Sequence, residues 1–184
     1  MKKPIVVNLF GAPGAGKSTI AAQIFFLLKT YGVNAELVTE FAKDKTWEHN
    51  LKALGVQEYV FGKQSYRLAR CRDDVEVIVT DSPLPLSIIY NHNEALDKDG
   101  HFSQVVLNIF NTYNNCNYVL KRVKPYNPKG RNQTEEESDA LFAPILDLLH
   151  DLKIPFEIRN GDEETGAAIA KDVLDRVNIN KGDV

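Results

Sequence analysis

Residues 4–19 read PIVVNLFGAPGAGKST, and this stretch decides the fold. Residues 4–10 are apolar and rich in β-branched side chains, which predicts a buried strand. Residues 11–18 match the pattern G-x-x-x-x-G-K-[ST], and apolar side chains then recur at helical spacing from Lys17 to about Tyr31. A strand, a glycine-rich loop and an amphipathic helix in this order are typical of a phosphate-binding loop.

The glycine-rich loop has a clear physical logic. Glycines let backbone N–H groups turn toward an anion without a clashing Cβ, and the helix that follows points its positive end at the same anion. We expect Lys17 to reach the β- and γ-phosphates of ATP, and Ser18 to offer its hydroxyl to Mg²⁺. A purely structural turn is the alternative, but it would not need the lysine–serine pair. The residues predicted to bind ATP are Gly11, Ala12, Pro13, Gly14, Ala15, Gly16, Lys17, Ser18 and Thr19.

Outward from this loop, predicted strands alternate with predicted helices. The further strands are expected at 35–39, 75–80, 117–120 and 155–158. The further helices are expected at 44–54, 57–72, 84–91, 102–113, 134–150 and 164–177, with a frayed tail at 178–184. Thr134 followed by Glu137 predicts a capping box. The alternation indicates an α/β fold with a mostly parallel sheet.

Length and composition limit the alternatives. A chain of 184 residues with 43% hydrophobic and 26% charged residues fits one globular domain over 1–184. The net charge of −3 argues against a protein that binds nucleic acid over its whole surface. Cys71 and Cys116 are far apart in the sequence, so neither a disulfide scaffold nor a zinc site is expected. No apolar stretch approaches the roughly 18 residues of a membrane span. We expect a cytoplasmic protein without membrane contacts, and a homodimer stays an open alternative.

Four segments carry a resemblance to a known family: GAPGAGKST, VTEFAKD, FGKQ and VTDSPLPL. The chain resembles the P-loop kinase superfamily, in its small nucleoside and nucleotide kinase branch. Within that branch it is similar to the ribosylnicotinamide kinase domain of bacterial NAD-biosynthesis regulators and to related small phage ATP-binding proteins, over roughly residues 4–165. The resemblance implies a three-layer fold whose five parallel strands lie in the order 2-3-1-4-5, with a mobile lid over the phosphates.

Two carboxylates are expected near the phosphate-binding loop because each follows a predicted strand. Asp81 ends the apolar strand 75–80, where it can hold Mg²⁺ or cap the next helix. Glu40 ends the strand 35–39, where it can accept the proton of a hydroxyl or bind a sugar, or remain a solvated surface charge. Asp44 can serve as the N-cap of the helix predicted at 44–54.

The predicted helix 57–72 supplies candidates for acceptor binding. Gln64 can bind a base or an amide through paired hydrogen bonds, an interpretation that the resemblance of the FGKQ segment supports. Arg67 and Arg70 can bind an anionic acceptor or simply form a surface face. Trp47, the one tryptophan, can stack on a base or sugar, or pack against the protein.

The basic segment 121–133, KRVKPYNPKGRNQ, shows no apolar periodicity and is predicted to be the lid loop. Arg122 and Arg131 are its best candidates for stabilising charge on a transferred phosphoryl group, because a planar guanidinium matches phosphate oxygens. Tyr126 can stack on a nucleotide. Asn160 and Gly161, in the turn after the last predicted strand, are candidate nucleotide contacts or a plain tight turn.

These features predict an enzyme that uses ATP and Mg²⁺ to phosphorylate a nucleoside-like hydroxyl. A nucleoside monophosphate kinase is the first alternative, and a kinase of a modified base in DNA is the second. A nucleotide-dependent switch or ATPase that acts on a partner protein is the alternative from another class. The sequence disfavours that class, because no glutamate or glutamine lies next to Asp81 to hold a catalytic water. The expected partner is a small nucleoside or nucleotide, and nucleic acid is a less favoured partner.

Overall fold

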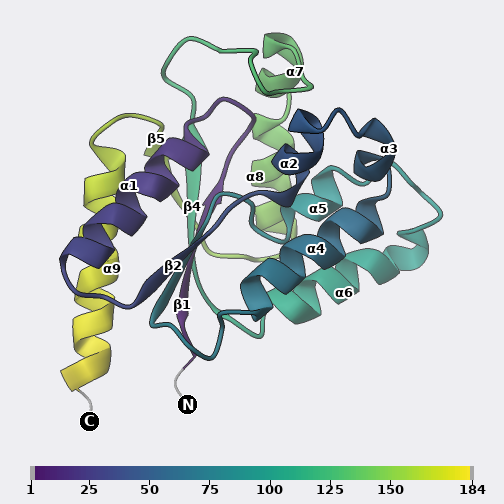
Figure 1. Cartoon of the computed structure of the whole chain (residues 1–184). Helices are drawn as coiled ribbons and strands as arrows, with labels where there is room; N and C mark the ends of the chain where they lie inside the picture. The colour runs from purple at the N-terminus through teal and green to yellow at the C-terminus, as the bar shows by residue number, and fades with distance from the viewer. Residues whose placement is uncertain (1–2, 183–184) are drawn as a thin grey trace.

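The computed structural model describes residues 3–182, and within them it contains one five-stranded sheet (Figure 1). The strands are β1 Ile5–Phe10, β2 Ala35–Val38, β3 Val77–Thr80, β4 Asn114–Lys121 and β5 Glu157–Asn160. All neighbouring strands pair in parallel, in the order β2-β3-β1-β4-β5. This confirms the α/β fold and the strand order that the resemblance implied.

Helices cover both faces of this sheet. They are α1 Lys17–Thr30, α2 Phe41–Trp47, α3 Leu51–Leu54, α4 Gln57–Ala69, α5 Leu86–Ile89, α6 His101–Phe110, α7 Glu135–Asp139, α8 Phe142–Asp151 and α9 Thr165–Gly182. A single 3₁₀ turn, Lys98–Gly100, precedes α6. Among the residues described, no helix is long and apolar enough to cross a bilayer.

Strand β1 shows how the two faces are built. Its side chains alternate, so that Val7 and Leu9 join the core under α1 and α9, and Val6 and Phe10 join the core on the opposite face. That opposite core is formed with α4, α6 and α8. All six residues of β1 are buried, as expected for the central strand of a parallel sheet. The carboxyl ends of the strands lie at one edge of the sheet, at the top of Figure 1, and loops project from that edge.

The segment predicted as one helix at 44–54 is two helices, so that prediction is wrong. The chain turns at His49, whose φ of 54° is left-handed, and Asn50 then starts α3 by accepting a hydrogen bond from the Ala53 N–H. The first helix begins at Phe41, which places Asp44 inside it. The expectation that Asp44 is an N-cap is therefore also wrong.

Several other boundaries differ from the sequence-based expectations, among them those of β4, β5 and α9. Strand β4 begins at Asn114, three residues early, because the buried Asn8 amide donates to the side-chain oxygens of Asn115 (2.9 Å) and Asn117 (3.0 Å) and makes a polar stretch part of the sheet. Strand β5 is shifted to Glu157–Asn160. Helix α9 continues to Gly182, so fraying at 178–182 is wrong, and residues 183–184 lie outside the described part.

The predicted capping box is confirmed, and residues 122–133 of the segment predicted as the lid form a loop. Thr134 Oγ1 accepts from the Glu137 N–H at 3.2 Å, and Glu137 Oε2 accepts from the Thr134 N–H at 2.8 Å. The helix that follows is shorter than expected, because α7 ends at Asp139 and α8 begins at Phe142. Between β4 and α7 the chain forms no helix or strand, and it lies above the carboxyl edge of the sheet in Figure 1.

Candidate functional site

A cavity of about 360 Å³ lies where the strand ends, the lid and the helices α2 to α5 meet. The phosphate-binding loop and the start of α1 form one side, which we call the phosphate lobe. The other side, which we call the acceptor lobe, is formed by side chains of α2 to α5 and the segments beside them. The residues that line the acceptor lobe are Glu40, Ala42, Lys43, Thr46, Leu54, Gln57, Val60, Gln64, Leu86, Ser87, Tyr90 and His92.

In the phosphate lobe, Lys17 lies folded over the loop from which it projects. Its Nζ donates to the carbonyl oxygens of Gly11 at 2.7 Å and of Ala12 at 3.1 Å. Burial lowers the pKa of this ammonium, and the nearby carboxylates of Glu40 and Asp81 oppose that effect. A phosphate entering the lobe would replace the two carbonyls as the partner of Lys17.

One glycine in the loop and one glycine packed behind it show why side chains would not fit there. Gly16 has a φ of 94°, which side-chain-bearing residues rarely adopt. Gly161, in the turn after β5, packs so closely that an added Cβ would lie 2.1 Å from the carbonyl oxygen of Ala15. Gly161 therefore supports the loop from behind and does not line the cavity. Asn160 is exposed and does not line it either.

Asp81 and Ser18 have the chemistry of a magnesium site. Asp81 is only 2% exposed, and its Oδ1 has no hydrogen-bond partner within the described part of the chain. Ser18 is exposed and lines the same cavity. Mg²⁺ prefers oxygen ligands, and it commonly binds through one or two carboxylates together with substrate phosphates and water. The orphaned carboxylate oxygen fits that donor set, so these two residues could hold the ion.

Glu40 lies between the two lobes, at the N-cap position of α2. Burial raises the pKa of its carboxyl above the ordinary value of 4.5, the Lys17 ammonium lowers it, and Asp81 raises it further. Tyr90 lines the same cavity, and its burial, followed by the charge of Glu40, raises the pKa of its hydroxyl. A carboxyl with a raised pKa holds a proton more strongly than an ordinary carboxyl, which suits it to accept one from a hydroxyl.

Two residues of α4 hold the turn that carries Glu40. Gln64 Oε1 accepts from the Phe41 N–H at 2.8 Å, and its Nε2 donates to the Thr39 carbonyl at 3.4 Å. Arg67 donates to the same carbonyl at 3.1 Å and pairs with Asp44. Both ends of the Gln64 amide are thus engaged by the backbone on either side of Glu40, although its side chain also lines the cavity.

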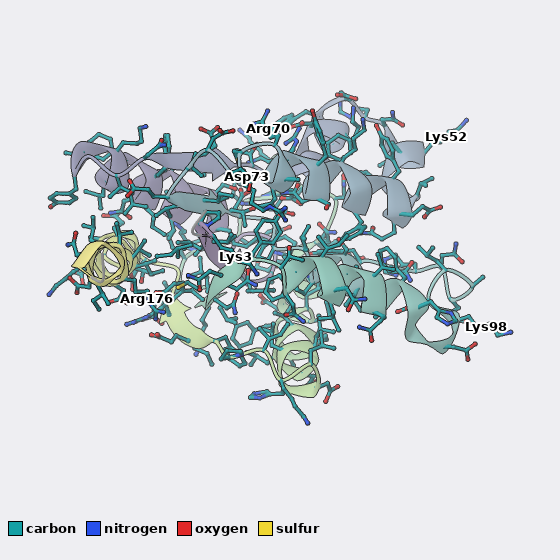
Figure 2. All side chains as sticks on the ribbon, turned by 90° about the horizontal axis from the view of Figure 1, so that it is seen from below. Lys3, Lys52, Arg70, Asp73, Lys98 and Arg176 are labelled. Carbon is teal, nitrogen blue, oxygen red and sulfur yellow. The ribbon has the colours of Figure 1, made fainter. Side chains whose placement is uncertain are left out.

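Neither arginine of α4 lines the cavity. Arg67 is half-buried against the turn before α2. Arg70 is the exposed C-cap of α4, and the view from below labels it together with Asp73, on the side of the molecule away from the strand ends (Figure 2). The structure therefore places neither of these two predicted site residues in the cavity, although Arg67 contacts the turn that carries Glu40.

The lid arginines have different surroundings. Arg131 lines the cavity. Arg122 is paired with two acids of α7, Glu135 at 2.6 Å and Asp139 at 2.5 Å, and it does not line the cavity. Both guanidinium groups lie over the ring of Tyr126, at 5.6 Å for Arg122 and 5.3 Å for Arg131.

Contacts hold the lid over the cavity. The Tyr126 ring packs on Gly14 of the phosphate-binding loop, and Trp47 packs on Gly130 of the lid. Trp47 is 61% exposed and does not line the cavity. The Ser138 hydroxyl of α7 donates to the Pro13 carbonyl at 2.6 Å. Through these contacts the lid and α7 are attached to the phosphate-binding loop, and the lid is attached to α2.

Sequence reasoning missed several cavity residues, among them Gln57, Ser87, Tyr90 and His92. Gln57 precedes Gln64 by seven residues, so helical periodicity could have placed both on one face. Ser87 and Tyr90 belong to α5 and its end, directly after the VTDSPLPL segment, and no pattern of their own marks them.

The fold and this cavity define a P-loop nucleotide-binding protein. The family model described as "AAA domain" matches residues 6–165, so the chain belongs to that family. No curated protein matches the chain. One solved structure, titled "Crystal structure of APE1195", is 19% identical, with 97% of each chain covered and a TM-score of 0.49. At that level the likeness says nothing about activity.

Proposed function

We propose that this protein is a kinase that transfers the γ-phosphate of ATP to a hydroxyl of a nucleoside-like acceptor. The observation that carries the proposal is the position of Glu40. Its carboxyl lines the same cavity as Lys17 and Asp81, and burial raises its pKa. A hydroxyl acceptor needs a group that takes up its proton, whereas a phosphate acceptor is already ionised and needs cations instead.

The distribution of cations also supports a neutral acceptor. Arg67 and Arg70, which would suit an anionic acceptor, do not line the cavity, and Lys43 is the one lysine that lines the acceptor lobe among the described residues. On the other side, Lys17, Lys129 and Arg131 line the phosphate lobe and the lid above it. Positive charge is therefore concentrated where the triphosphate would bind.

In the proposed reaction, Glu40 accepts the proton of the acceptor hydroxyl as its oxygen attacks the γ-phosphorus. A new phosphorus–oxygen bond forms, and the bond between the γ-phosphorus and the β–γ bridging oxygen breaks, releasing ADP. Lys17 and Arg131 stabilise the charge that develops on the transferred group. Bound Mg²⁺, held through Asp81 and Ser18, would neutralise the phosphate oxygens. The closed lid would exclude water and so limit hydrolysis of ATP.

Transfer from γ-labelled ATP tests the proposal. Nucleosides, nucleoside monophosphates and DNA with modified bases are each incubated with the enzyme, labelled ATP and Mg²⁺. Labelled product and inorganic phosphate are then separated and counted. We expect product with nucleosides and little phosphate release without an acceptor.

Other results would overturn the hydroxyl acceptor. Product from monophosphates alone would identify a nucleoside monophosphate kinase. Product from DNA alone would identify a kinase of a modified base. ATP turnover that no acceptor changes would instead indicate a switch or ATPase.

A further inference from the structure

The buried face of α4 carries two glutamines whose amides differ in their partners. Gln57 is 7% exposed and Gln64 is 3% exposed, and both side chains line the cavity. Both ends of the Gln64 amide are hydrogen-bonded to the backbone of the turn before α2. No group among residues 3–182 makes a hydrogen bond to the Gln57 amide.

Gln57 is largely buried, and it lines the cavity, so an amide without a protein partner there is open to water or to a ligand in that cavity. Gln57 is the first residue of α4, and the fold does not use its side chain to cap or brace a neighbouring element. Its amide therefore offers a donor pair and an acceptor to whatever occupies the cavity. This is the pattern expected of a binding residue, and a bracing residue such as Gln64 shows the opposite pattern.

The surroundings of Gln57 suit a flat ring with a polar edge. Leu54, Val60 and Leu86 contribute apolar side chains from three different helices to the same cavity. Ser87 of α5 is also buried, and no residue in the described range makes a hydrogen bond to its hydroxyl. The apolar walls can contact the faces of a ring, and the two free polar side chains can contact its edge.

The spacing of Gln57 and Gln64 along α4 indicates how long the acceptor is. Seven residues separate Gln57 from Gln64, which corresponds to about 10 Å along a helix. Gln64 is hydrogen-bonded to the residues on both sides of Glu40. A group bound at Gln57 would therefore lie about two helical turns of α4 away from the residue that holds the Glu40 turn. A base joined to a sugar can span this distance, whereas a sugar or a base alone is too short.

We propose that Gln57 is a specificity-determining residue that binds an amide or lactam edge on the base of a nucleoside acceptor, with Ser87 as the second polar contact. The inference deepens the proposed function and rests on it for the position of the reacting hydroxyl. A lactam edge presents an N–H beside a C=O, and a glutamine amide can pair with both at once. A base that lacks this edge would leave the buried Gln57 amide unpaired, so the site would reject it.

Stability measurements on the free protein give the first test, because they need no substrate. Gln57→Leu and Gln57→Met replace an unpartnered buried amide with an apolar side chain of similar size. We expect the Tm of both variants to stay within about 2 °C of the wild type or to rise. Gln64→Leu is the matched control on the same helix face. It leaves the Phe41 N–H without its partner and removes one of the two side-chain hydrogen bonds to the Thr39 carbonyl, so its Tm should fall by about 4–8 °C. An equal fall for both Gln57 variants would mean that Gln57 is structural and would overturn the proposal.

Paired acceptors give the second test. Inosine and purine riboside differ by a lactam edge, and uridine and phenyl riboside differ in the same respect. Wild-type kcat/KM should favour the lactam member of at least one pair by about 10²-fold or more. In Gln57→Leu and Gln57→Met this preference should fall to a few-fold. A preference that survives both substitutions would overturn the proposal even if phosphoryl transfer is demonstrated.

Binding without transfer separates this inference from the proposed function. The Tm is measured with a non-hydrolysable ATP analogue and each nucleoside. Lactam nucleosides should raise the Tm of the wild type but not that of Gln57→Leu. If this occurs and no nucleoside is phosphorylated, the proposed function fails and the assignment of Gln57 stands. If neither lactam nucleoside raises the wild-type Tm, the assignment of Gln57 is overturned.

Discussion

The two lobes of the cavity are built in different ways. The phosphate lobe comes from one contiguous loop between β1 and α1, whose backbone N–H groups and glycines follow directly from the local sequence. The acceptor lobe is assembled from side chains of α2, α3, α4 and α5, which are separate in the chain. The first lobe is therefore a property of a motif, and the second is a property of how four helices pack.

This difference predicts how substitutions act. A change in the phosphate lobe removes a group that every reaction cycle needs, so it should stop turnover with any acceptor. A change in the acceptor lobe should alter which acceptor is used. Lys17, Glu40 and Asp81 line the same cavity, and the charges of Glu40 and Asp81 influence the pKa of Lys17. Substitutions of these three residues should give the largest effects on rate.

The largest effect is expected for Lys17→Ala, which should lower kcat by about 10³–10⁵-fold, the range found when a cation beside a transferred phosphoryl group is removed. The Tm should not fall substantially, because burial disfavours the Lys17 ammonium and lowers its pKa. The measurement is ATP turnover with the best acceptor. Lys29→Ala, an exposed lysine in the last turn of α1, is the control and should behave as wild type. Near-normal turnover in Lys17→Ala would remove the basis of the kinase assignment.

Asp81→Asn should come next, with turnover in Mg²⁺ reduced by about 10²–10³-fold. The amide keeps the shape of the side chain but loses the charge suited to the ion, so nucleotide binding measured without metal should change little. Titrating Mg²⁺ should show a raised requirement for the ion. An equal loss of turnover and of metal-free nucleotide binding would point to a folding role for Asp81.

The two arginines of α4 sharpen the comparison between bracing and binding. Arg67→Ala removes hydrogen bonds to Thr39 and the pair with Asp44, so we expect the free energy of unfolding to fall by about 1–3 kcal/mol. Arg70→Ala changes an exposed helix end and should stay within about 0.5 kcal/mol of the wild type. Urea unfolding measures both. A large rise in acceptor KM for Arg70→Ala at unchanged stability would instead indicate an anionic acceptor.

How much of this could be predicted from the sequence follows the same division. The phosphate-binding loop and the strand ends Asp81 and Glu40 were predictable, because parallel strands bring their carboxyl ends to one edge. Gln64 and Gln57 could both be placed on one face of α4, but their roles could not be separated. The amide that forms hydrogen bonds with the protein is the one beside the turn at Thr39–Phe41. The position of that turn is fixed by tertiary packing.

The lid shows the same limit. Its basic composition predicted a loop that contacts phosphates, and Arg131 does line the cavity. The sequence gives no reason to separate Arg131 from Arg122, because both are arginines in the same short segment. The difference arises from Glu135 and Asp139 of α7, which pair with Arg122 in the folded chain.

The smallest effect concerns pH and stability. Burial raises the pKa of the Glu40 carboxyl in the folded state above the ordinary value of 4.5. Below that value the carboxyl is protonated in both the folded and the unfolded state, so its burial carries no charge penalty. As the pH rises through the raised pKa, the buried carboxyl ionises and the free energy of unfolding falls. Glu40→Gln has no such group to ionise. We therefore expect the variant to be more stable than the wild type by about 0.5–2 kcal/mol at pH 8 and equally stable near pH 4. Urea unfolding at the two pH values measures this, and a variant that is less stable at pH 8 would contradict the direction of the shift.

The most direct test of the central claim is kcat of Glu40→Gln on the best acceptor. If Glu40 accepts the proton of a hydroxyl, kcat should fall by about 10²–10⁴-fold. The affinity for ATP should barely change, because Glu40 follows β2 and lies outside the phosphate-binding loop. A Glu40→Gln enzyme with nearly wild-type kcat would contradict the claim that this cavity phosphorylates a hydroxyl.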